Sequence, residues 1–262
     1  MTEERREKIR ILLSEKPFVS LHELQEMFPE VSHMTLRRDI DFFEKSGAAI
    51  KVRGGARSVK FIGETVEDAF TDRMKSHVEE KTGIAKAAAA YIEPGRSIFI
   101  DSGSTAEKLA GFLPDERLTF TTTSPSIALE LCRAGHHAVN IVGGRVDPDN
   151  RSVSGMYAMK FILEMNIDIA FLSPSGMSLS GSFTCGNYSE GELKSTVAKK
   201  ARLVIMLMDR SKIDKMLPFT FCEMKDVDVL ICDGELPFEA RAAAEAAGTV
   251  LINISKEHGN SD

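Results

Sequence analysis

The sequence has few cysteines and no pattern that would join them in a metal site or a disulfide framework. It contains four cysteines, no two of which form a C-x-x-C pair, and most of them stand beside apolar residues. This favours reduced, partly buried thiols over disulfides or zinc. The adjacent pair His136-His137 adds no metal site, because neighbouring side chains do not converge on one ion in regular structure. We expect no metal site, and we expect this pair to lie on a surface loop.

Long apolar runs are also missing. No run approaches the roughly 20 residues of a membrane helix, and the first residues, MTEERREK, lack the apolar core of a secretory signal. With 43% hydrophobic and 27% charged residues, the composition is that of a soluble globular protein. We therefore expect a cytoplasmic protein without membrane contact. Its 262 residues can hold one small module and one larger domain with its own core.

Common nucleotide-binding and hydrolase motifs are absent too. The chain has no G-x-x-x-x-G-K-[ST], no G-x-G-x-x-G and no G-x-S-x-G. We expect no cofactor and no catalytic residue.

The most informative segment that is present is S-H-M-T-L-R-R-D, residues Ser32–Asp39. Ser32 is a suitable N-cap for a helix that begins at His33. One helical stripe of this segment and its continuation is apolar and should face a core: Leu36, Ile40 and Phe43. Arg37 and Arg38 then point outward, where a guanidinium group suits a guanine edge or a phosphate. Taken alone, the octet fits a solvated surface helix equally well.

The flanking residues favour DNA binding. Residues 3–15 form one helical pattern, and a second short pattern opens at Ser20 and ends at Pro29. Downstream, residues 49–53 alternate like a strand, Gly54-Gly55 supplies a turn, and residues 57–61 can return as a second strand. This order predicts a winged helix-turn-helix whose hairpin lies along phosphates or in the minor groove. The predicted DNA-binding residues are Ser32, His33, Thr35, Arg37, Arg38, Lys51, Arg53 and Arg57.

The distribution of charge agrees with this prediction. Residues 33–60 carry seven basic and three acidic side chains, although the whole chain has a net charge of −6. An acidic protein with a local basic segment is attracted to DNA through that segment.

The remainder of the chain alternates between apolar runs and helical patterns. The runs that predict strands are 97–100, 118–122, 139–142, 167–172, 203–208, 227–232 and 250–254. The helical patterns include 104–113, 125–134, 156–165, 189–201 and 237–247. This alternation predicts an α/β domain with a largely parallel sheet. We expect a DNA-binding domain over 1–60, a linker over 61–75 and a larger α/β domain over 76–262.

Polar residues follow several of these strands, at the sheet edge where ligands of α/β domains bind. The segment 101–105, D-S-G-S-T, joins hydroxyls and a glycine to a helix start, which suits an anion such as phosphate. The segment 209–212, D-R-S-K, ends another strand, and Glu190 and Lys194 stand four apart on a helix. Gly143-Gly144 follows a further strand. Three of these features have a plainer alternative: an N-cap at Ser104, an ordinary turn at Gly143-Gly144, and a surface pair at Glu190 and Lys194.

These motifs resemble the DeoR/GlpR family of bacterial transcriptional regulators nearly from end to end. The matching motifs in the first part are V-S-x-x-T-L-R-R-D (31–39), F-F-E-K-S-G (42–47) and V-R-G-G-A (52–56). Those in the second part are E-K-x-x-I-A (80–85), P-G (94–95), I-D-S-G-S-T (100–105), V-G-G (142–144), Glu190 with Lys194, and D-R-S-K (209–212). The chain departs from the family at Thr122-Thr123-Ser124, where T-N-S is common, and at Ser173–Gly176, where a glycine-containing turn is frequent.

The resemblance implies a sensor domain with the architecture of sugar-phosphate isomerases and related transferases. It also implies a repressor of sugar or polyol catabolism that a phosphorylated effector releases from operator DNA, acting as a homodimer or homotetramer. The expected effector-binding residues are Asp101, Gly103, Ser104, Thr105, Thr123, Ser124, Gly143, Gly144, Glu190, Lys194, Asp209 and Lys212.

Two other functions stay open from the residues. The larger domain could be a sugar-phosphate isomerase or transferase that uses Asp101, Glu190 or Lys194 in acid–base roles, although residues 1–60 would then have no purpose. It could also be a regulator whose second domain binds no ligand and only mediates oligomerisation.

Overall fold

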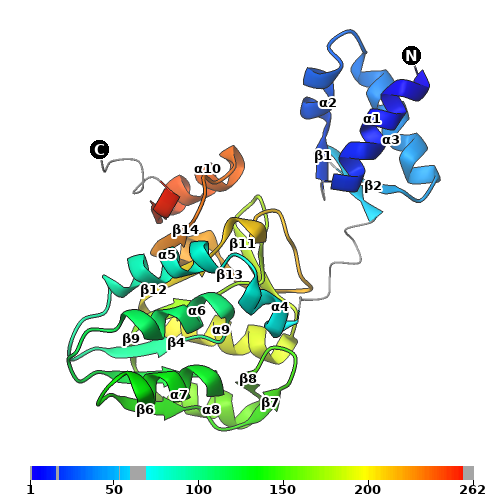
Figure 1. Ribbon diagram of the computed structural model, residues 1–262. Coiled ribbons are helices and arrows are strands. Elements are labelled where there is room, and N and C mark those ends of the chain that lie inside the picture. Colours follow the sequence, from blue (N-terminus) through cyan, green and yellow to red (C-terminus); the bar gives the residue numbers. More distant parts are fainter. Residues whose placement is uncertain (1, 16–17, 53, 60–68, 256–262) are drawn as a thin grey trace, which may run out of the picture. The chain divides into compact units, whose positions relative to one another are not determined.

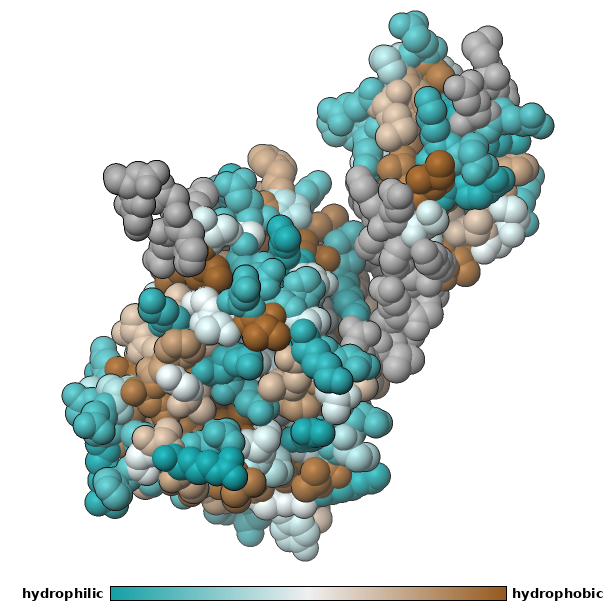
Figure 2. All heavy atoms as spheres, in the orientation of Figure 1, coloured by the Kyte–Doolittle hydropathy of each residue, from teal (hydrophilic) through white to brown (hydrophobic). Residues whose placement is uncertain are grey.

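Figure 1 shows the computed structural model of the chain, which describes residues 2–15, 18–52, 54–59 and 69–255. Contacts within the chain divide it into two compact units, Met1–Val66 and Glu67–Asp262. Each unit has a hydrophobic core of its own. On the face shown in Figure 2, brown apolar side chains lie scattered among teal hydrophilic ones on both units.

The first unit is a three-helix module with a small antiparallel sheet. Its helices are α1 (Thr2–Glu15), α2 (Leu21–Met27) and α3 (His33–Lys45). Its strands are β1 (Phe18–Ser20), β2 (Ala49–Val52) and β3 (Gly55–Ser58), in the order β1-β3-β2. The core joins all three helices through Ile9, Leu13, Leu24, Leu36, Ile40 and Phe43. This confirms the predicted winged helix-turn-helix.

Two details of this unit differ from the prediction. The second strand of the wing begins at Gly55 rather than Arg57, because the turn is tight and Gly54 adopts φ +90°. Strand β1 was not predicted, since it has only three residues. It pairs with β3 through Val19 opposite Ala56, and both side chains are buried.

The second unit is built on a seven-stranded parallel sheet of order β15-β14-β12-β9-β4-β5-β6. Its strands, each of which overlaps a predicted segment, are β4 (Ser97–Ile100), β5 (Thr119–Thr122), β6 (Ala138–Ile141), β9 (Ile167–Leu172), β12 (Ala201–Met208), β14 (Val229–Cys232) and β15 (Val250–Asn253). The central strands are apolar on both faces, as a sheet covered by helices on both sides requires.

Helices cover both faces of this sheet (Figure 1). The core on one face joins α5 (Val78–Ala89), α6 (Ser104–Leu109) and α7 (Pro125–Ala134) to side chains such as Ile98 and Phe120. The core on the other face joins α8 (Met156–Glu164), α9 (Tyr188–Lys200) and α10 (Phe238–Ala247) to side chains such as Phe99 and Met206. The predicted α/β architecture is therefore confirmed.

Further elements of the second unit were not predicted. Strands β7 (Arg145–Asp147) and β8 (Ser152–Ser154) form a hairpin, and β10 (Gly176–Met177), β11 (Ser182–Cys185) and β13 (Phe219–Glu223) form a three-stranded antiparallel sheet. Short 3-10 helices span Ala110–Phe112, Arg210–Lys212 and Met224–Asp226.

The segment expected to be linker, 61–75, contains helix α4 (Phe70–Lys75), while residues 61–68 lie outside the described part of the chain. The helix packs on the second unit because Phe70 and Arg73 are buried there, and the Phe70 N–H donates to the Asp149 carbonyl over 3.2 Å. The second unit thus contains a helix before residue 76. Among the described helices, none has the length and apolar character needed to cross a membrane.

Candidate functional site

Helix α3 presents its basic residues to the outside of the first unit. Ser32 caps the helix, since its Oγ accepts from the Thr35 N–H over 3.2 Å and lies 3.0 Å from Thr35 Oγ1. The side chains of Ser32, His33, Arg37 and Arg38 are exposed, and that of Thr35 is half-buried. The helix therefore offers two guanidinium groups to a partner outside the unit, whereas the hydroxyls of Ser32 and Thr35 hold its first turn.

Asp39 lies on the same helix but faces inward, which sequence reasoning missed. It is 1% exposed and accepts from Arg5 Nε over 2.6 Å and from Arg6 Nε over 2.9 Å. Arg6 also stacks on the Phe42 ring, with its guanidinium carbon 3.9 Å from the ring centroid. These contacts fix α1 against α3, so Asp39 orients the helix that carries the exposed arginines.

The wing is described only in part. Lys51 is exposed on β2 and forms an ion pair with Asp41 of α3, which ties the hairpin to that helix. Arg53 lies outside the described residues, and so does the side chain of Arg57, whose backbone belongs to β3.

In the second unit, four polar residues follow neighbouring strands at the carboxyl edge of the parallel sheet. Asp209 follows β12, Ser173 follows β9, Asp101 follows β4 and Thr123 follows β5, and these strands are adjacent in this order. All four side chains are buried. The sheet thus brings together residues that are far apart in the sequence, at the place where α/β domains bind their ligands.

Asp101, Glu190 and Lys194 form a buried group that we call the charge centre. Lys194 Nζ lies 2.8 Å from Asp101 Oδ2 and 2.9 Å from Glu190 Oε1, and it donates to the Ser173 carbonyl over 2.7 Å. All three ammonium protons therefore have acceptors. The alternative of a surface pair at Glu190 and Lys194 is wrong, because both side chains are buried on the inner side of α9.

Burial and charge act in opposite directions in this centre. Burial disfavours the charged form of Lys194, but Asp101 and Glu190 outweigh it and raise the pKa of Lys194 above its usual range. Burial also raises the pKa of Asp101, which Lys194 lowers in turn. Lys194 therefore stays protonated, and its positive charge is already neutralised by the two carboxylates.

A second buried cation, Lys81 on α5, lies near Asp209. Lys81 Nζ is 4.0 Å from Asp209 Oδ2 and donates to the carbonyls of Arg73 and Ser76 at the end of α4. Burial lowers the pKa of Lys81 to about 8, with Asp209 acting against this shift and the cations of Lys212 and Arg73 adding to it. Sequence reasoning missed Lys81, although it stands inside the quoted E-K-x-x-I-A motif.

Two buried oxygen atoms at this edge have no hydrogen-bond partner: Ser173 Oγ and Asp209 Oδ2. Such atoms are costly to bury unless a ligand or a water satisfies them. Gly103 lies directly against Ser173, since a Cβ at Gly103 would be 3.0 Å from Ser173 Cβ. Gly103 also has a φ of +148°, which favours glycine. The absence of a side chain at residue 103 keeps β9 and the start of α6 close together.

The N-cap position of α6 is Gly103, which corrects the alternative of an N-cap at Ser104. Ser104 is the first residue of the helix, and no side chain caps its first N–H groups. Ser104 and Thr105 are both buried, and they follow Asp101 closely in the sequence. Their hydroxyls and the first N–H groups of α6 thus belong to the same edge as the charge centre.

The other expected site residues have more local roles. Thr123 Oγ1 accepts from the Ser102 N–H over 3.2 Å, and Ser124 caps α7 by accepting from Ile127. Gly143 and Gly144 are exposed after β6 at the margin of the sheet, and a Cβ at Gly144 would lie 2.5 Å from the Ser154 carbonyl oxygen. Lys212 is half-buried in the 3-10 helix that follows Asp209.

Hydrogen bonds connect the charge centre to helix α4. Glu190 Oε2 accepts from Asn150 Nδ2 over 3.2 Å, and Asn150 Oδ1 accepts from an Arg73 guanidinium nitrogen over 2.8 Å. Arg73 belongs to the first described helix after the segment that joins the two units. We call Glu190, Asn150 and Arg73 the relay.

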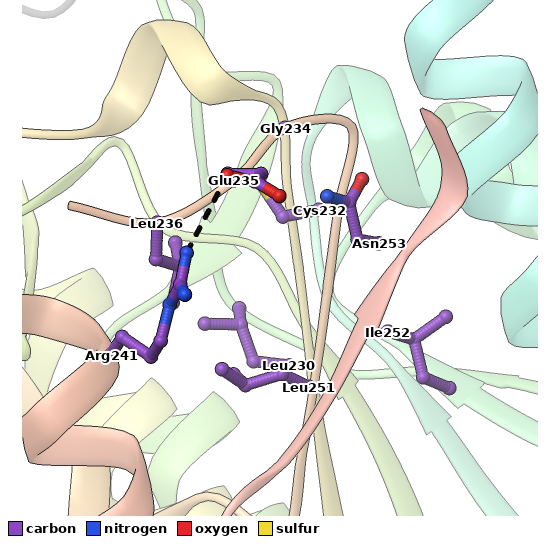
Figure 3. A pocket seen from close by; sticks show the side chains of 9 residues that line it. All are labelled: Leu230, Cys232, Gly234, Glu235, Leu236, Arg241, Leu251, Ile252 and Asn253. Atoms are coloured by element: carbon purple, nitrogen blue, oxygen red, sulfur yellow. Dashed lines mark ion pairs between the residues drawn. The ribbon is translucent and has the colours of Figure 1, made fainter. Parts of the chain in front are cut away.

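A separate hollow of about 320 Å³ lies between β14, β15 and α10 (Figure 3). It is lined by Leu230, Cys232, Gly234, Glu235, Leu236, Arg241, Leu251, Ile252 and Asn253. Glu235 and Arg241 pair across its rim at 3.6 Å, over a mostly aliphatic floor. The residues that line it include none of the expected effector-binding residues.

The cysteines are free thiols, with Cys132 exposed and Cys185, Cys222 and Cys232 buried. Burial raises the pKa of Cys222 and of Cys232 to about 12, so neither is a reactive thiolate at neutral pH. Within the described residues, no group of three or more His, Cys, Asp or Glu side chains could hold a metal ion.

Comparisons with known proteins match both units. The model of the DeoR-like helix-turn-helix domain matches residues 5–61, and that of the DeoR C terminal sensor domain matches residues 76–234. The HTH-type transcriptional regulator GolR of Listeria innocua is 32% identical over 89% of this chain and 91% of its own length. The HTH-type transcriptional regulator GlpR of Haloferax volcanii is 28% identical over 95% of this chain and 97% of its own. A ribose 5-phosphate isomerase structure from Methanocaldococcus jannaschii is 18% identical, with a TM-score of 0.38 over 53% of this chain and 55% of that one.

Proposed function

This chain belongs to the DeoR family of transcriptional regulators, and we propose that it represses a sugar or polyol catabolic operon until a phosphorylated sugar-type effector releases it from operator DNA. The observation that carries this proposal is the buried sheet edge of the second unit, where charged groups surround two oxygen atoms without hydrogen-bond partners. The proposed location is the cytoplasm, where both partners occur.

In this proposal α3 enters the major groove of the operator. Arg37 and Arg38 are exposed on consecutive positions of the helix, so one can bind a base edge while the other binds a phosphate. Lys51 adds a phosphate contact from the wing, together with Arg53 and Arg57. His33 lies at the exposed start of the helix, where the first residues of a recognition helix contact bases.

The effector fits the sheet edge by its chemistry. A phosphate group is suited to the hydroxyls of Ser104 and Thr105 and the uncapped start of α6, with Lys212 supplying positive charge. Sugar hydroxyls are suited to Asp209 Oδ2 and Ser173 Oγ, the two buried oxygen atoms at this edge that have no hydrogen-bond partner. Asp101, Glu190 and Lys194 shape the floor of this site, because their charges are already paired with one another.

The relay offers a route from this site to the DNA-binding unit. An effector that shifts the charge centre also shifts Glu190, and through Asn150 it shifts Arg73 on α4. Helix α4 is the first described helix after the segment that joins the two units, so in this proposal it is the element through which effector binding reaches the DNA-binding unit. Release requires that the effector bind the conformation of low DNA affinity more tightly than the DNA-bound one.

The proposal assigns the chain no catalytic step. The raised pKa of Lys194 makes it a fixed cation at neutral pH and a poor proton acceptor. Turnover of aldose phosphates by the full chain would instead support the isomerase or transferase alternative, and a panel of such substrates tests it.

Two measurements test the proposed function. A mobility-shift titration of the full chain with the DNA upstream of its own gene should give specific binding that competitor DNA does not abolish. A thermal-shift screen against phosphosugars should find a ligand that adds about 2.7 kcal/mol of stability at ~100 times its dissociation constant. That ligand should then lower operator affinity. Specific DNA binding without any stabilising phosphosugar would support the regulator that senses no ligand.

A further inference from the structure

Helix α8 leaves an unusual amount of apolar surface exposed. It buries Ala158 and Ile162, while Met156 is 77%, Tyr157 72% and Leu163 57% exposed. Phe161 is exposed as well. Among the described helices, no other has more than two large apolar side chains exposed. Four such side chains on a nine-residue helix mark a contact surface rather than scattered exposure.

Beside this helix the surface is hollowed. One hollow of about 570 Å³ is lined by residues of α8, α9 and β13, among them Leu163, Tyr188 and Phe219. A second hollow of about 420 Å³ is lined by Met156 and Lys160, among others. The two hollows share Met159, Leu163 and Glu192, so they form one groove along α8 and α9.

The exposed strip of α8 also carries one charge of each sign. Five exposed residues follow the spacing of a single helical face: Met156, Tyr157, Lys160, Phe161 and Glu164. Lys160 and Glu164 stand four residues apart on this strip. When two such strips cross about a two-fold axis, Lys160 of each copy can face Glu164 of the other, so the surface is complementary to itself.

We propose that this surface, the outer face of α8 with the adjoining groove of α9, binds the same surface of a second copy of the chain. A two-fold contact joins the same patch of both copies, so the patch must be complementary to itself, and this patch offers both a ridge and a groove. The first unit has a single recognition helix per chain, whereas helix-turn-helix proteins bind two half-sites as dimers. A second copy therefore accounts for the apolar area, the charges and the DNA-binding module together.

The test measures the mass of the full chain in solution, without DNA, by light scattering and sedimentation. We expect the parent to be a dimer, or a tetramer containing this contact. Tyr157→Glu should weaken the association at least roughly 30-fold, the effect of losing a central interface residue worth about 2 kcal/mol. Leu129→Glu is the matched control and should keep the parent's mass. Leu129 is 60% exposed on α7, which packs on the opposite face of the sheet from α8.

A charge exchange tests whether the partner is a second copy. Lys160→Glu and Glu164→Lys should each weaken the association, because each places like charges opposite one another. The double variant should restore it, since both pairs then regain opposite charges. The circular dichroism spectrum of each variant below its melting transition must match that of the parent, which separates lost association from lost folding.

Three outcomes would overturn the proposal. The first is a monomeric parent. The second is an oligomer whose mass is unchanged by both Tyr157→Glu and a second variant, Phe161→Glu. The third is a double charge variant that associates no more tightly than the single variants. DNA binding and effector binding are measured separately, so failure here is distinguishable from failure of the proposed function.

Discussion

Replacement of Lys194 by methionine tests what holds the sheet edge of the second unit together. In Lys194→Met, Asp101 and Glu190 stay buried but lose the Nζ atom that lies 2.8 Å and 2.9 Å from them. Removing one partner of a buried ion pair costs about 3–5 kcal/mol, because an uncompensated charge remains. At about 2–4 °C per kcal/mol, the melting temperature should fall by about 6–20 °C. Thermal unfolding followed by circular dichroism measures this change.

The loss should also depend on pH. Burial already raises the pKa of Asp101 above 3.8, and removing Lys194 should raise it further. A carboxyl group with a raised pKa binds its proton more tightly in the folded chain, so stability is highest at low pH and falls as pH rises through the folded pKa. The raised pKa of Lys194 keeps the parent's contribution from this residue constant below about pH 10. The variant should therefore be closer to the parent at pH 5 than at pH 8.

Two controls define the result. Lys86→Met removes an exposed lysine from helix α5 of the same unit and should change stability by less than about 0.5 kcal/mol. A triple variant, Asp101→Asn with Glu190→Gln and Lys194→Met, removes every charge of the centre and should recover most of the loss. A loss of under ~1 kcal/mol, or an equal loss at both pH values, would refute the role of Lys194 as the counter-ion of two buried carboxylates.

Four further predictions concern the DNA-binding helix and the sheet edge. Arg37→Ala and Arg38→Ala should each weaken operator binding. One should lose about 1–3 kcal/mol of discrimination between bases, and the other should show a flatter dependence of affinity on salt concentration. If both variants bind the operator as the parent does, the assignment of α3 as the recognition helix is wrong. Asp39→Asn should lower the melting temperature of the first unit and weaken binding to all DNA sequences alike, because α1 loses its charged contact with α3. Ser173→Ala should keep or raise the melting temperature, since it deletes a buried hydroxyl without a partner, yet weaken effector binding in titrations. Asn150→Ala should keep effector binding in thermal shift while reducing release in mobility shifts, and unchanged release would exclude the relay.

The parallel sheet was predictable because its strands are short apolar runs that alternate with helical patterns. Segments 97–100 and 167–172, for example, are the observed strands β4 and β9. The antiparallel strands of the second unit were missed for the opposite reason. Strand β11 mixes serine, threonine and phenylalanine over four residues, and its partner β13 is more than thirty residues away in the sequence. Neither has a local pattern that distinguishes it from a loop.

The charged residues show where sequence reasoning about the site ends. Asp101, Glu190 and Lys194 were expected at the site, but nothing in the sequence shows that they neutralise one another. Lys81 and Asp39 were missed because helical periodicity assigns a charged residue to the surface. Each is buried through partners from another element: Asp209 for Lys81, and two arginines of α1 for Asp39. Such pairings depend on tertiary contacts.

Helix α9 is the element that joins the proposed effector site to the proposed contact between copies. Its inner side carries Glu190 and Lys194, while Glu192 and Lys199 on its outer side line the groove beside α8. Gly191 lets the helix approach β11 closely, since a Cβ there would lie 3.1 Å from Cys185 Sγ. Close-packed interiors have low compressibility and transmit strain between neighbouring side chains. A shift of the charge centre on effector binding would therefore displace the groove as well, and the two-fold contact would differ between the DNA-bound and the released states.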